Sequence, residues 1–159
     1  MPDWISHILI ALIISKIFNI KEKSLLVLGS LLPDFILKLQ LLSLFFPKLF
    51  EIRYALIPFH APFGLFLLTI IITPLFKHNY KKTFSLISMG WILHLIADSI
   101  TKHIFMGETF FLLPFSFKSL EAGIIWPEQY LFVLVPLVVI YLITNKLTKK
   151  ANFSKKQKH

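Results

Sequence analysis

Long apolar stretches dominate this chain and constrain its fold more than any other feature. Five of them alternate with short polar, mostly basic breaks, and they run approximately over residues 4–20, 24–46, 55–76, 83–105 and 130–147. A helix needs about 17–25 apolar residues to cross a bilayer. Hydrophobic residues make up 56% of the chain, and a soluble fold of this size would expose apolar surface that it could not cover. We therefore expect an all-α fold, a polytopic transmembrane bundle of about five spans.

The stretches leave room for a single transmembrane domain, residues 1–147, followed by a basic, disordered cytoplasmic tail, residues 148–159. Within the second stretch, Pro33 lacks a backbone donor and clashes with the carbonyl group four residues earlier. We expect a kink or a break in the helix at Pro33. Asp34 would then lie in the first turn of a new half-helix, where free N–H groups favour a carboxylate.

Basic residues indicate how the chain is oriented. The net charge is +9. If the N-terminus lies outside, twelve Lys and Arg residues flank the spans on the inner side and four on the outer side. Cytoplasmic flanks carry such an excess, so we expect a multi-pass protein of the cell membrane with its N-terminus outside and its C-terminus in the cytoplasm. Its partners would be membrane lipids and not nucleic acid, since no soluble domain presents the basic face.

A few ionisable residues interrupt the apolar stretches. Each costs about 2.5–3.5 kcal/mol at the centre of a membrane helix, so such side chains usually face the bundle interior and have a function. His94 and Asp98 are four residues apart and share one helix face. They could bind one metal ion or form a hydrogen-bonded pair that locks two helices. Gly90, one turn earlier, would let a neighbouring helix approach closely.

The other intramembrane candidates allow more than one interpretation. Asp34 could be a ligand or a helix-capping carboxylate, and Lys38, one turn later, could pair with it or extend toward the interface. His60, two residues after Pro58, could be a ligand or could contact lipid headgroups. His7 near the start of the first span is the weakest signal. The chain has no cysteine, so any metal must be held by His, Asp or Glu.

Five short motifs follow one another along the chain. They are Ser6-His7, Gly29–Asp34 (Gly-Ser-Leu-Leu-Pro-Asp), Phe59-His60-Ala61, His94 with Asp98 and Thr101, and Leu113–Ser116 (Leu-Pro-Phe-Ser). In this order they resemble the membrane-bound metal-dependent hydrolases, typified by LexA-regulated inner-membrane proteins of bacteria. That family often has a second acidic residue where this chain has Ile36, and His-Arg where it has Ala55 and Leu56. These departures weaken the expectation of a two-metal site.

The leading hypothesis is an integral membrane metal-dependent hydrolase that cleaves an ester or phosphoester of a lipid or lipid-linked substrate. Asp34 or Asp98 would act as general base, and histidine with carboxylate ligands suits zinc first, then manganese or magnesium. The predicted metal ligands are His7, Asp34, His60, His94 and Asp98. A small ion- or proton-coupled transporter and a catalytically inactive membrane scaffold are the alternatives.

Overall fold

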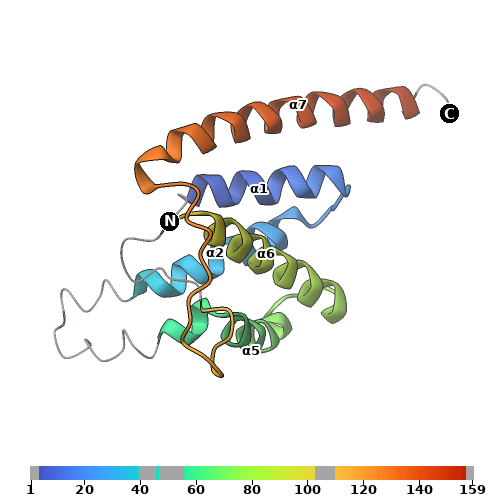
Figure 1. Cartoon of the computed structure of the whole chain (residues 1–159). Coiled ribbons are helices and arrows are strands. Elements are labelled where there is room, and N and C mark those ends of the chain that lie inside the picture. The colour runs from blue at the N-terminus through green and yellow to red at the C-terminus, as the bar shows by residue number, and fades with distance from the viewer. Residues whose placement is uncertain (1–3, 40–45, 47–55, 103–109, 157–159) are drawn as a thin grey trace.

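The fold is all-helical, as the sequence predicts. The computed structural model of the chain describes residues 4–39, 46, 56–102 and 110–156, and every regular element among them is a helix (Figure 1). The α-helices are α1 (Trp4–Ile17), α2 (Lys23–Lys38), α5 (Pro62–Ile72), α6 (Tyr80–Ile100) and α7 (Tyr130–Lys156), and the short 3-10 helices are η3 (Ile57–His60), η4 (Thr73–Leu75) and η5 (Pro127–Gln129).

A bundle of five full-length spans is not supported. Each predicted stretch contains a helix, but among the described residues only α6 and α7 are long and apolar enough to cross a membrane. At 1.5 Å per residue, the 14 residues of α1 extend about 21 Å, against roughly 30 Å for the hydrocarbon core. The third stretch is divided into three short helices, and Pro58, Pro62 and Pro74 each lie at the first or second position of one of them.

The predicted break at Pro33 is wrong. Helix α2 runs without interruption from Lys23 to Lys38 with Pro33 inside it. A proline removes one helical hydrogen bond, and packing against neighbouring helices can hold the segment together across it; α2 packs against both α1 and α6. Asp34 therefore lies within a continuous helix and not in the first turn of a new one.

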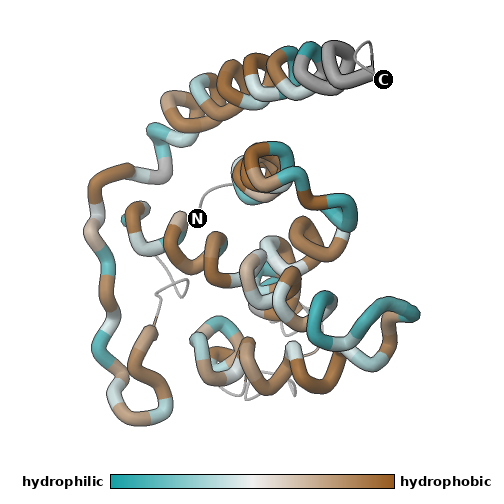
Figure 2. The backbone as a smooth tube through the Cα atoms, turned by 90° about the vertical axis from the view of Figure 1, so that its right-hand side faces the viewer, coloured by the Kyte–Doolittle hydropathy of each residue, from teal (hydrophilic) through white to brown (hydrophobic). Residues whose placement is uncertain are grey.

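Helix α7 extends through residues predicted to form a disordered tail. It continues to Lys156, and residues 157–159 lie outside the described part of the chain. It packs along α1, where the Lys16 ammonium lies 4.4 Å from the centre of the Tyr141 ring. Between Leu131 and Leu147, most apolar side chains of α7 form an exposed surface, with Phe132 80% exposed, and Figure 2 shows the hydrophobic character of this part of the helix. This surface is suited to contact with lipid.

Helices α2 and α6 cross with their backbones in close contact. A methyl group placed on Gly90 would lie 2.3 Å from the carbonyl oxygen of Leu26, and one on Gly29 would lie 2.2 Å from that of Ile87. Both glycines are therefore required for the two backbones to meet, which confirms the close approach predicted at Gly90. Apolar side chains of α2, α5 and α6 pack around the crossing in one cluster, which includes Leu25, Leu65, Ile87 and Leu95.

A surface ion pair joins the start of α6 to the turn before α2. The Lys82 ammonium lies 2.7 Å from the Glu22 carboxylate. The hydrogen bond from Lys82 lowers the pKa of the Glu22 carboxyl group. Both side chains are partly exposed, so we expect little contribution to stability.

Candidate metal centre

Helix α6 supplies two adjacent site residues. His94 and Asp98 lie one turn apart and are both fully buried, with Nε2 of His94 3.2 Å from Oδ2 of Asp98. The predicted shared face is therefore confirmed, and both side chains point into the protein.

A hydrogen bond across the glycine crossing orients His94. Its Nδ1 lies 2.7 Å from the carbonyl oxygen of Ser30 in α2. Because a carbonyl only accepts, Nδ1 carries the proton, and in the neutral ring Nε2 keeps its lone pair for another partner. Metal-binding histidines typically have this arrangement. Sequence reasoning missed the role of Ser30, since the contact depends on a helix crossing that no local pattern reveals.

The short helix η3 brings His60 to the same point. Helix η3 begins at Ile57, with Pro58 as its second residue, and ends at His60. Helix α5 packs so closely that a methyl group on Gly64 would lie 2.0 Å from the Pro58 carbonyl oxygen. The Nε2 atom of His60 is 3.3 Å from both His94 Nε2 and Asp98 Oδ2. Tetrahedral ligands bound at 2.0–2.1 Å are separated by about 3.3 Å, so the spacing of these three atoms fits one zinc-sized ion.

Asp34 completes the group from α2. Its Oδ1 lies 4.0 Å from His94 Nε2. The side chain is fully buried, and neither carboxylate oxygen has a hydrogen-bond partner among the described residues. Buried carboxylates normally have hydrogen bonds or bind a cation. One ligand atom from each of four buried residues lies within 4.8 Å of the others, so these residues could hold a metal ion: Asp34, His60, His94 and Asp98.

His7, the fifth predicted ligand, lies beside this group and not within it. Its Nε2 is 3.5 Å from Asp98 Oδ1, and its ring stacks on His94 with 4.0 Å between ring centres. These contacts suit a residue that positions Asp98. The role of His7 as a metal ligand stays a prediction. Lys38 does not reach the cluster, because its ammonium lies 4.0 Å from the centre of the Trp4 ring.

Fold and site together define an all-helical protein with a buried histidine–aspartate cluster able to hold a metal ion. The chain matches no protein-family model, no curated protein and no solved structure. The chemistry of the cluster is therefore argued from its own residues.

Proposed function

We propose that the protein is an integral membrane metal-dependent hydrolase that acts on a phosphoester or ester of a lipid or lipid-linked substrate. The observation that carries this proposal is the Asp34 carboxylate, buried without a hydrogen-bond partner among the described residues, beside three potential ligand atoms 3.2–3.3 Å apart. A purely structural network would be expected to satisfy such a carboxylate.

Charge balance supports a divalent ion. Asp34 and Asp98 place two carboxylates in one buried cluster. Within the described part of the chain, Asp34 forms no ion pair with a lysine or arginine. Two carboxylates match the charge of a dication, and a set of imidazole and carboxylate ligands suits zinc ahead of manganese or magnesium.

The roles follow from the distances. His60, His94 and Asp98 would hold the ion, with His94 oriented by Ser30 and Asp98 contacted by His7. A bound zinc ion lowers the pKa of a water molecule to about 7. Asp34 lies farther from His94 than Asp98 does, at 4.0 Å against 3.2 Å. We assign it as the general base, which would take a proton from the attacking water and return it to the oxygen of the departing alcohol as the ester bond breaks.

The hydrolase proposal predicts metal-dependent cleavage of chromogenic esters. The full chain, loaded with zinc or manganese in lipid nanodiscs, should hydrolyse nitrophenyl phosphodiesters or carboxyl esters. A chelator should remove the activity and added metal should restore it. Activity that persists in the presence of the chelator would contradict the proposal. So would the absence of hydrolysis of both substrate classes by protein that has metal bound. Uptake of an ion by proteoliposomes that depends on Asp98 would favour a transporter instead.

We also propose a multi-pass topology, with the N-terminus outside and the C-terminus in the cytoplasm. The support is the excess of basic residues on the inner flanks, twelve against four when each of the five apolar stretches is counted as one crossing, and the exposed apolar side chains of α7. Because the chain has no cysteine, single reporters can be introduced. In intact cells a membrane-impermeant thiol reagent should label Lys118→Cys, before α7, and should label Lys150→Cys only after permeabilisation. The reverse pattern would overturn the orientation.

A further inference from the structure

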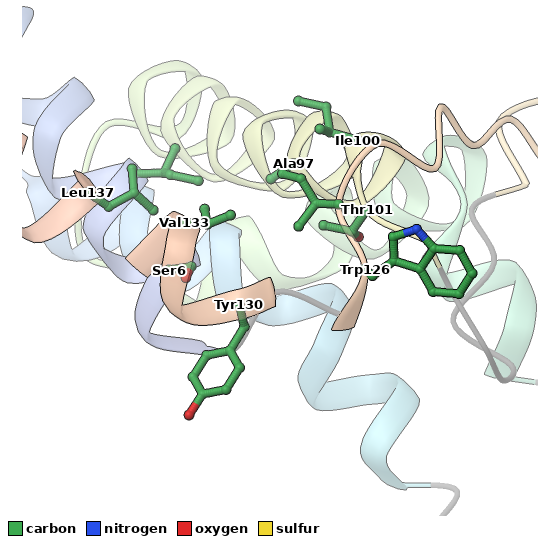
Figure 3. A pocket seen from close by; sticks show the side chains of 10 residues that line it. Ser6, Ala97, Ile100, Thr101, Trp126, Tyr130, Val133 and Leu137 are labelled. Atoms are coloured by element: carbon green, nitrogen blue, oxygen red, sulfur yellow. The ribbon is translucent and has the colours of Figure 1, made fainter. Parts of the chain in front are cut away.

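A cavity of about 120 Å³ lies between α1, the end of α6 and the first turns of α7 (Figure 3). Its walls are almost wholly apolar, with Ile10 from α1, Ala97 from α6, and Val133 and Leu137 from α7. Apolar cavities of roughly 150 Å³ stay dry and bind small hydrocarbons such as benzene. The chemistry of this cavity therefore suits a hydrocarbon group.

The cavity adjoins the candidate metal centre. Ser6 and Ala97 line it, and each directly precedes a residue of the cluster in the chain, His7 and Asp98. Thr101 also lines it, and its hydroxyl donates a 3.0 Å hydrogen bond to the backbone carbonyl of Asp98. Ser6, Ala97 and Thr101 thus link the cavity wall to His7 and Asp98 through neighbouring positions of α1 and the end of α6.

A cation lies against one residue of the cavity wall. The Lys102 ammonium is 3.9 Å from the centre of the Trp126 ring, and Trp126 lines the cavity. A cation above an indole ring is held by the negative ring face. An anionic group in the cavity beside Trp126 would be attracted to this positive charge. A phosphoester is anionic at neutral pH, whereas a carboxyl ester is not.

We propose that the cavity holds the first methylenes of the hydrocarbon chain of a long-chain phosphoester, whose phosphate lies toward the metal centre and Lys102. This inference rests on the proposed function and narrows its substrate to phospholipid-like molecules. The chain would enter from the bilayer beside α7, whose outer surface is apolar.

Binding of phosphonates tests the inference, because they cannot be hydrolysed. Octylphosphonate and methylphosphonate are titrated by calorimetry into zinc-loaded full chain in nanodiscs. To wild type, octylphosphonate should bind at least about tenfold more tightly than methylphosphonate, since burial of two or three methylenes suffices for that gain in affinity. The ratio of the two affinities is the quantity compared between variants. Val133→Trp, which fills the cavity, should lower this ratio about tenfold. Val135→Trp, on the exposed face of the same helix, is the matched control and should keep it.

The outcomes separate the two claims. If methylphosphonate binds and both tryptophan variants keep the wild-type ratio, the chain cavity is wrong and the proposed function stands. If neither phosphonate binds to metal-loaded protein, the phosphoester hydrolase proposal fails and this inference with it. Should Val133→Trp fail to fold, Ala97→Leu from the opposite wall replaces it in the same comparison.

Discussion

Asp34→Asn is expected to lower kcat by roughly 10²–10⁴-fold, the usual contribution of a general base, while about one metal ion per chain is retained. Asparagine has nearly the same shape as aspartate but cannot accept the proton from water at neutral pH. Asp34 is placed for this role by its distance of 4.0 Å from His94 Nε2 and by its carboxylate without a hydrogen-bond partner among the described residues. Single-turnover hydrolysis and metal content, measured on the same preparation, test both parts.

Lys38→Gln is the control for Asp34→Asn. It also removes a charge from α2, one turn away, but the Lys38 ammonium lies over Trp4 and outside the cluster. Its activity should stay within about twofold of wild type. If Asp34→Asn loses metal and activity together, Asp34 is a required ligand and the general base lies elsewhere. If it keeps full activity, Asp34 has no part in the reaction.

Gly90→Ala is expected to destabilise the protein by about 1–3 kcal/mol, the typical cost of overpacking, and to reduce metal affinity. The added methyl group would meet only backbone atoms, at 2.3 Å from Leu26 O and 2.7 Å from Ser30 N. Neither can rotate away, so α2 and α6 must separate. That movement would stretch the 2.7 Å hydrogen bond from His94 to Ser30 and shift Asp34 away from the cluster.

Thermal unfolding and zinc titration of Gly90→Ala measure the two effects. Ile92→Ala, in the same helix but 44% exposed, is the control and should change stability by no more than about 0.5 kcal/mol. A Gly90→Ala protein with wild-type stability and zinc affinity would show that the close helix crossing does not hold the site together.

The sequence predicts the composition of the site better than the shape of the fold. His94 and Asp98 at helical spacing, with Gly90 one turn earlier, predict a shared face and a close helix crossing, and both are found. Because charges in apolar stretches tend to face inward, the same reasoning selects Asp34 and His60, which join the cluster. His7 is found beside the cluster, since the position of α1 along α6 depends on packing.

Of the other features, the division of the third stretch has a local signal that span length outweighed, and the rest depend on tertiary contacts. An apolar run of adequate length predicts a span, but prolines at 58, 62 and 74 divide the third run into short helices. Local chemistry predicts a break at Pro33, whereas α2 continues through it. The bond from His94 to the Ser30 carbonyl joins residues 64 positions apart. The sequence signal for this contact was the pair Gly29-Ser30 in one helix and Gly90 in another. This signal does not reveal which two helices pack together.

Metal content tests the central claim most directly. Detergent-purified wild type and a His94→Ala, Asp98→Ala double variant would be incubated with zinc, freed of unbound metal and analysed by mass spectrometry, with circular dichroism to confirm that both are folded. We expect about one ion per wild-type chain and none in the folded double variant. No metal in wild type after incubation with zinc or manganese, or equal metal in both proteins, would contradict a metal centre at Asp34, His60, His94 and Asp98.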